Sequence, residues 1–423
     1  METTVSSVRQ QSTATPLWLP LSLLLSGAVA SVLLGIGAIF VLPEALTDPQ
    51  AMHVLALVHT ATLGWWTMTI MGAMYQLVPV VLVTRLRAVP LAYCQMLLYL
   101  VGVTLLISGF WFTLLPLLAI GGTLVVVAAT VFAVHLLATI LLASRRPLTA
   151  AYLIAALVYL LVVVSLGLTA ALNLRWGFLG AATQRLLLAH LVVGLGGWLA
   201  LTVIGISYKL APMFALVHRS SERFGWGLLI ALNLGLVSLA LSLGLAAPTW
   251  MLELAGGVLA LGLLGFVYDF WRMLRARQKQ TIDVMQRFAV AAPGYLALGV
   301  LLGSAIVAFH LDGAFGPLWL AAAYLMLLGW IGQSILGNLQ KIVPFLVWNQ
   351  RYASRVGREK TPLLRDLIHQ PTARLAFWLF NGGVLAEAVA LALANPLAIS
   401  LAAISVALAL ILCAVNIAGV LYR

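Results

Sequence analysis

Long, nearly unbroken apolar runs make up most of the chain, and short polar or basic stretches separate them. A helix needs about 20 apolar residues to cross the roughly 30 Å hydrocarbon core of a membrane. Helices are favoured over strands because backbone groups in lipid must be satisfied within the segment, and the runs lack the alternation of membrane β-barrels. The pattern predicts an all-α integral membrane protein with twelve transmembrane helices, at approximately 17–42, 51–83, 89–110, 116–143, 150–172, 185–217, 226–247, 249–274, 286–310, 316–348, 373–393 and 397–421.

Composition supports lipid as the main solvent of this chain. Hydrophobic residues make up 63% and charged residues only 8%, with a mean hydropathy of +1.11, whereas soluble domains carry about 25% charged residues. The net charge of +12 lies in short clusters between the apolar runs, which is typical of topology signals and excludes a nucleic-acid-binding face. No gap between the runs is long enough for a soluble domain. We expect residues 1–423 to form a single transmembrane domain whose main partner is the lipid bilayer.

Basic residues also predict the orientation. With the N-terminus inside, all of the 23 Lys and Arg except Arg175 and Arg185 fall at the cytoplasmic side. The positive-inside rule therefore predicts that both termini are cytoplasmic, in a multi-pass protein of the bacterial inner membrane.

A sequence motif recurs at offsets of 133 and 132 residues. The second, sixth and tenth runs share GW, a second glycine eight residues after the first, and a proline seven residues later. The three-copy pattern predicts a threefold repeat of a four-helix unit, with units at about 17–145, 150–277 and 286–421. Its copies are "GWWTMTIMGAMYQLVP" (64–79), "GWLALTVIGISYKLAP" (197–212) and "GWIGQSILGNLQKIVP" (329–344).

Close helix packing explains much of this motif. Glycines eight residues apart lie near one helix face and let a neighbouring helix or a flat ligand approach the backbone. The prolines Pro79, Pro212 and Pro344 are expected to kink or end their helices.

Twelve helices in three units, together with the stretch "HTATLGWWTMTIMGAMYQLVP" (59–79), resemble subunit I of the haem-copper oxidase and nitric oxide reductase superfamily. The stretch is particularly similar to the tenth helix of the C-type cytochrome c oxidases, in which an H-x-H pair is followed by GW and then by G, Y and P at this spacing. The resemblance implies a respiratory-chain protein in which such histidines hold two haems and a copper ion.

The ligand pattern matches only in part. The helix predicted at 226–247, where the family carries adjacent copper histidines, has no histidine, cysteine or methionine. Neither a bound copper ion nor a complete terminal oxidase is therefore predicted; whether the chain is an enzyme at all stays open. On the repeat register, the H-x-H positions are Leu57 and His59, His190 and Val192, and Ala322 and Tyr324.

His59, His190 and Tyr324 are the candidate cofactor-binding residues. The two histidines are expected at similar depth and facing the same central region, so they can hold one b-type haem or a single metal ion. Tyr324 lies at the equivalent position of the third unit and can ligate haem or donate a hydrogen bond. The alternative is that both histidines are structural and bond a carbonyl or hydroxyl across a helix contact.

Two acids within apolar runs, Glu253 and Glu387, also need a reason to be there. A charge at the membrane centre costs at least about 2.5 kcal/mol, so such residues indicate proton transfer or a buried polar partner. The pattern does not decide between these roles.

Two functions follow from these observations. The first is membrane electron transfer through a b-type haem, with a quinol or a periplasmic electron-transfer protein as partner, and with partner subunits. The second is a cofactor-free scaffold that acts as a transporter, a sensor or an assembly partner.

Overall fold

The computed structural model describes residues 15–215, 222–278, 282–311, 313 and 316–422. These residues contain twelve helical spans that are long and apolar enough to cross a membrane, with ends within five residues of those predicted. Nine spans are single α-helices: α1 (Trp18–Val41), α4 (Val89–Trp111), α5 (Leu115–Leu141), α6 (Leu148–Trp176), α9 (Arg223–Gly244), α10 (Thr249–Arg275), α11 (Val284–Phe309), α14 (Gln370–Ala392) and α15 (Pro396–Val420).

The other three spans each contain a π-helical segment between two α-helices. In every case the π-helical segment carries the repeated GW dipeptide, and these are the three π-helical segments in the described part of the chain. A π-helical turn widens the backbone by one residue and often lies at a functional site. The spans are α2 (Met52–His59), η2 (Thr60–Thr67) and α3 (Met68–Val81); α7 (Thr183–Leu191), η4 (Val192–Ala200) and α8 (Leu201–Ala215); and α12 (Pro317–Tyr324), η5 (Leu325–Gly332) and α13 (Gln333–Arg351).

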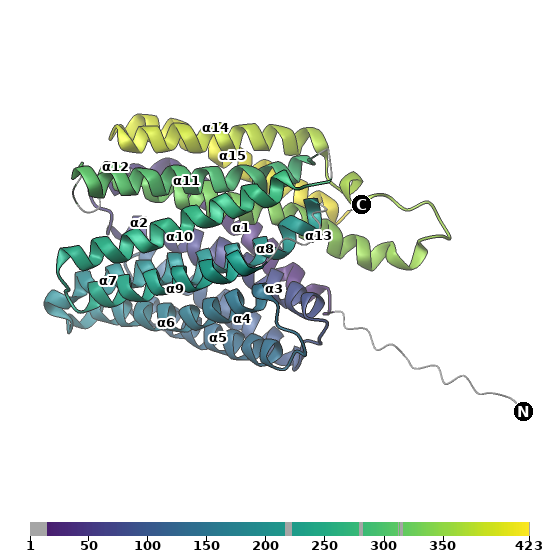
Figure 1. The fold of residues 1–423 in the computed structure, drawn as a ribbon, viewed down its shortest axis with the longest axis horizontal. Coiled ribbons are helices and arrows are strands. Elements are labelled where there is room, and N and C mark those ends of the chain that lie inside the picture. The colour runs from purple at the N-terminus through teal and green to yellow at the C-terminus, as the bar shows by residue number, and fades with distance from the viewer. Residues whose placement is uncertain (1–14, 216–221, 279–281, 312, 314–315, 423) are drawn as a thin grey trace, which may run out of the picture.

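The helices run side by side along the length of the molecule (Figure 1). The first and last spans, α1 and α15, pack against each other. Their approach is close: a Cβ atom on Gly35 would lie 2.9 Å from the Cα atom of Ala407. The glycine therefore allows two distant parts of the sequence to meet.

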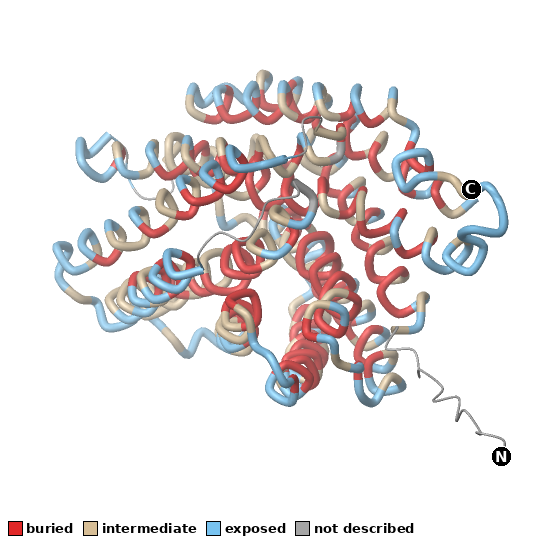
Figure 2. The backbone as a smooth tube through the Cα atoms, turned by 45° about the vertical axis from the view of Figure 1, so that its right-hand side comes forward, coloured by how far each residue is buried: buried red, intermediate tan, exposed pale blue. Residues whose placement is uncertain are grey.

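The three spans with π-helical segments form the most buried part of the bundle. In their most apolar windows, 67%, 56% and 72% of residues are buried, compared with at most 50% in the other nine spans. They also contact one another, through α3 with α13, η4 with η5, and a hydrogen bond between Trp198 and Thr67. Figure 2 shows the buried residues gathered on the inward sides of the helices, with exposed residues outside.

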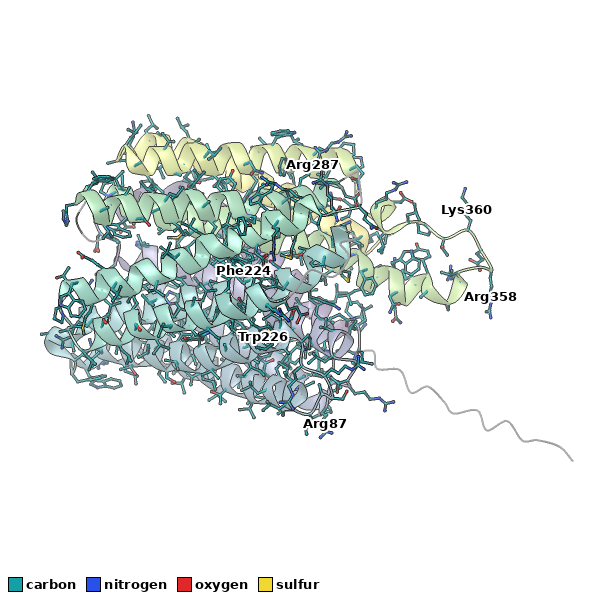
Figure 3. All side chains as sticks on the ribbon, viewed as in Figure 1. Arg87, Phe224, Trp226, Arg287, Arg358 and Lys360 are labelled. Atoms are coloured by element: carbon teal, nitrogen blue, oxygen red, sulfur yellow. The ribbon has the colours of Figure 1, made fainter. Side chains whose placement is uncertain are left out.

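Basic side chains gather at one end of the bundle, which we call the basic face. It carries the turns at 82–88 and 142–147, the residues that follow α10 at 276–278, and the segment 352–369. Figure 3 shows Arg87, Arg287, Arg358 and Lys360 there.

Pro344 does not end its helix, although an end was one of the two outcomes expected for the prolines of the motif. Pro79 lies two residues before the end of α3, but Pro344 lies within α13, which continues to Arg351. Proline lacks only one backbone donor, and the helix after Pro344 is held by buried contacts of Leu346 and Val347. Tertiary packing therefore outweighs the local preference to stop.

Candidate functional site

His59 is the last residue of α2, directly before the π-helical segment η2. Its Nδ1 lies 2.7 Å from the carbonyl oxygen of Leu55, and its ring stacks on Phe110 at a centroid distance of 4.8 Å. Because a carbonyl can only accept, Nδ1 carries the proton, and the lone pair of a neutral imidazole is then on Nε2.

His190, on the span that carries the second copy of the motif, is also held by a backbone carbonyl, but by one on another helix. Its Nδ1 lies 3.1 Å from the carbonyl oxygen of Val163 on α6. The ring lies over Gly167, where a Cβ atom would come within 2.9 Å of the histidine Cε1. His190 therefore also presents Nε2 as its free nitrogen.

His59 and His190 lie on spans that contact each other through the hydrogen bond between Trp198 and Thr67, and the two rings are close enough to interact electrostatically. Among the described residues, neither Nε2 atom has a hydrogen-bond partner. Two imidazoles with the same tautomer and with free Nε2 atoms form a donor set that suits haem iron.

Tyr324 has a different partner. It ends α12 directly before η5, and its hydroxyl donates a hydrogen bond to Oε2 of Glu387 on α14. Glu387 is 1% exposed, and its Oε1 has no hydrogen-bond partner among the described residues. The hydroxyl of Tyr324 is thus engaged by a buried carboxyl group, and this pairing was not foreseen from the sequence.

The other membrane acid, Glu253, is exposed near the start of α10. It needs no buried partner there. Of the two acids that the sequence singled out, Glu387 is the one that lies in the interior.

A second set of polar side chains lies beside the Tyr324–Glu387 pair, between α11, α13 and α14. The hydroxyl of Tyr295 donates to Oδ1 of Asn381 at 2.9 Å, and Nε2 of Gln333 donates to the same oxygen at 3.0 Å. Tyr295 is also within electrostatic range of Tyr324. The four polar side chains around Glu387 therefore lie in one region, although they come from four helices.

A glycine of the repeated motif makes room for this set. The ring of Tyr295 lies on Gly329, where a Cβ atom would be 2.7 Å from the tyrosine Cγ. Tyr159 lies on Gly197 in the same way, with a Cβ-to-Cγ distance of 2.4 Å. Two of the GW glycines thus accommodate a tyrosine ring, which is a more specific role than general helix packing.

A cavity of about 60 Å³ lies between α8, α10, α11, η5 and α13, in the half of the bundle nearer the basic face. Most of its wall is apolar, but Ser207, Ser334 and Asn338 give it a polar side, and the exposed Arg277 lines its end near the basic face. His59, His190 and Tyr324 do not line this cavity.

On α10, Asp269 forms an ion pair with Arg272, three residues farther on, at 2.6 Å. No group of three or more His, Cys, Asp or Glu that could hold a metal ion occurs in the part of the chain that the structure describes.

No family model matches this chain, and no curated protein sequence matches it.

Proposed function

We propose that this chain is a membrane electron-transfer protein that holds one b-type haem between His59 and His190. The observation that carries the proposal is the shared geometry of the two rings: each Nδ1 bonds a backbone carbonyl, and each Nε2 is free. Such a hydrogen bond fixes the tautomer and the orientation of a metal-ligating histidine.

Haem fits this donor set better than a bare metal ion. A tetrahedral or octahedral ion needs at least three or four protein ligands, and the described residues offer no such group. The haem macrocycle supplies its own nitrogen ligands, so two imidazoles complete the coordination of its iron.

When bound, the haem would supply one-electron redox chemistry. The protein's own part is to hold and orient the two imidazoles through the carbonyls of Leu55 and Val163. Phe110 stacks on one face of the His59 ring and leaves the in-plane lone pair of Nε2 uncovered. A haem held by His59 and His190 would supply electron transfer rather than substrate reduction.

We also propose that the chain consists of three related four-helix units and is a divergent relative of haem-copper oxidase subunit I. Three observations support this. The GW dipeptide lies in a π-helical segment in all three copies, these spans are the most buried, and they contact one another. The missing copper ligands argue for electron transfer without oxidase chemistry.

The environment follows from the charge pattern. We propose that the basic face is cytoplasmic, in a bacterial inner membrane, because the positive-inside rule places Lys and Arg clusters there. The histidines then lie in the half of the membrane nearer the periplasm. This depth suits exchange of electrons with a periplasmic protein or a membrane quinol, and partner subunits would dock on the bundle surface.

A cofactor-free scaffold is the second candidate, because both histidine rings are well packed as they stand. His59 stacks on Phe110 and His190 lies on Gly167. In this case the histidines only cross-link helices, and the bundle serves as a transporter, a sensor or an assembly partner.

Optical absorption separates the two candidates. Protein purified from haem-replete cells should show a Soret band that is lost or shifted in His59→Ala and in His190→Ala, because each variant removes one axial ligand. His53→Ala is the matched control. His53 is exposed in the first turn of α2, and its Nδ1 lies 3.7 Å from Oε2 of Glu44, which precedes that helix. A colourless wild-type protein, with both variants folded, would favour the scaffold.

A further inference from the structure

Glu387 is the most buried acidic side chain that the proposed electron transfer does not use. It is 1% exposed on α14, and its recorded hydrogen-bond partner is the Tyr324 hydroxyl. A carboxylate in such a place, without a cation beside it, is unstable relative to the neutral acid. The position is therefore suited to a carboxyl group that gains and loses a proton.

Among the described residues, the surroundings of Glu387 contain hydroxyl groups and no charged group at the same depth. The elements that pack on this part of α14 are α11, α12, η5 and α15. Their ionisable side chains near Glu387 are Tyr324 and Tyr295. The cations Arg287 on α11 and Arg374 on α14 lie at the far ends of their helices, Arg374 being thirteen residues or about 20 Å from Glu387.

A line of polar groups leads from this carboxyl group toward the basic face. Asn381 lies six residues before Glu387, about 9 Å along α14. It accepts hydrogen bonds from Tyr295 and Gln333 at 2.9 and 3.0 Å. Gln333 is fully buried, and its Oε1 has no partner among the described residues. Unpaired buried oxygens at both ends of this line, on Gln333 and Glu387, indicate that ordered water completes it.

The cavity comes near this line at Ser334, the residue after Gln333, although Gln333 and Tyr295 do not themselves line it. Ser334 lines the cavity together with Trp330 and Asn338, so the cavity extends along α13 past the level of Gln333. On α11, Pro293 lines the cavity and Tyr295 is two residues farther on. Polar residues inside a membrane protein commonly face a water-filled cavity and mark a proton or ion path.

We propose that Glu387 is a proton-exchange site that water reaches from the basic face, through the cavity and along Tyr295 and Tyr324. A proton from cavity water passes to the Tyr295 hydroxyl while that hydroxyl releases its own proton to bridging water. The same exchange at Tyr324 delivers one proton to the Glu387 carboxylate. The net change is one proton lost by water and one O–H bond formed on Glu387, with both tyrosines unchanged. Asn381 and Gln333 are positioning residues that hold the Tyr295 hydroxyl and the water.

Infrared spectroscopy of the full-length protein in liposomes tests this path without any assay of electron transfer. The wild-type protein should show the C=O band of a protonated carboxyl group that is absent in Glu387→Gln. On transfer to D2O, the band should shift as the carboxyl group exchanges. Tyr324→Phe and Asn381→Leu should slow this exchange by about 100-fold, the lower range of what a positioned proton-transfer group contributes.

A substitution that fills the cavity and a control substitution make the test specific. Ala289→Phe places a large side chain in the cavity and should also slow the proton exchange at Glu387. Asn233→Leu is the matched control. The Asn233 side chain on α9 donates to the Leu229 carbonyl of its own helix at 2.8 Å, just as the Asn381 side chain donates to the Phe377 carbonyl. Asn233 lies outside the proposed path. Exchange at the wild-type rate in both Tyr324→Phe and Ala289→Phe would overturn the proposal, as would a wild-type carboxyl band that does not exchange. The presence or absence of a Soret band bears only on the haem.

Discussion

The indole Nε1 of Trp198 donates a hydrogen bond to the Thr67 hydroxyl at 2.9 Å, and so joins the π-helical segments η2 and η4. The two residues are 131 positions apart, and both are buried. Their contact ties together the two spans that carry His59 and His190. The same indole position in the third span, Trp330, packs against Phe266.

Removing the acceptor of this bond should destabilise the protein. Thr67→Val keeps the shape of the side chain but leaves the buried Trp198 N–H unpaired, which costs about 1–3 kcal/mol. We expect a lower midpoint of thermal unfolding in detergent. Thr62→Val is the control, since the Thr62 hydroxyl bonds only the Val58 carbonyl of its own helix, and it should change the midpoint little. Equal midpoints for both variants would show that the bond adds no stability.

A methyl group on Gly197 should disrupt the packing of the second unit. Its Cβ would lie 2.4 Å from Cγ and 2.7 Å from Cβ of Tyr159. Because the clash includes the Cβ atom of Tyr159, turning the ring cannot relieve it, and the helices must separate. Overpacking of this kind costs about 1–3 kcal/mol, so Gly197→Ala should unfold at a lower temperature than the wild type.

Gly256→Ala provides the contrast for this substitution. A Cβ atom on Gly256 of α10 would meet nothing within 4 Å, and alanine favours a helix over glycine by about 0.5–1 kcal/mol. This variant should be as stable as the wild type or more so. If Gly197→Ala is also as stable as the wild type, the close packing of Tyr159 on Gly197 does not require a glycine there.

Single cysteines should report the orientation of the bundle. Cys94 and Cys413 are first replaced, and then Gln50→Cys and Ser354→Cys are made separately in exposed turns at opposite ends of the helices. A membrane-impermeant maleimide added to intact cells should label the cysteine at 50 and not the one at 354, because the positive-inside rule keeps the basic face in the cytoplasm. The reverse labelling pattern would invert the topology and place the cavity mouth outside.

Much of the fold could be predicted from local sequence. A run such as 115–141 must be a helix in lipid whatever its neighbours are, because its backbone has no other hydrogen-bond partners there. The burial of Trp65 was also foreseeable from its place in the repeated motif. A shared site for His59 and His190 is likewise expected from that motif and from the depth of each residue in its span, and it stays a prediction.

Other features depended on contacts between distant segments. The π-helical form of η2, η4 and η5 follows no simple residue rule, since ordinary α-helical periodicity fits these stretches equally well. The repeat marked the GW glycines as sites of close packing. No residue near Gly329 in the sequence indicated that the ring packed on it belongs to Tyr295. The only hint of the bond between Tyr324 and Glu387 was that a buried acid such as Glu387 requires a polar partner.

The sequence by itself determined the number of spans, their bounds and the motif that marks the central three, because hydrophobic length and repeated residues act within one helix at a time. Only the tertiary structure decided which polar groups meet inside the bundle. Tyr324 and Glu387 come from different helices, 63 residues apart, and their hydrogen bond depends on the depth and rotation at which those helices pack. Apolar side chains set that packing collectively, so no local pattern encodes it.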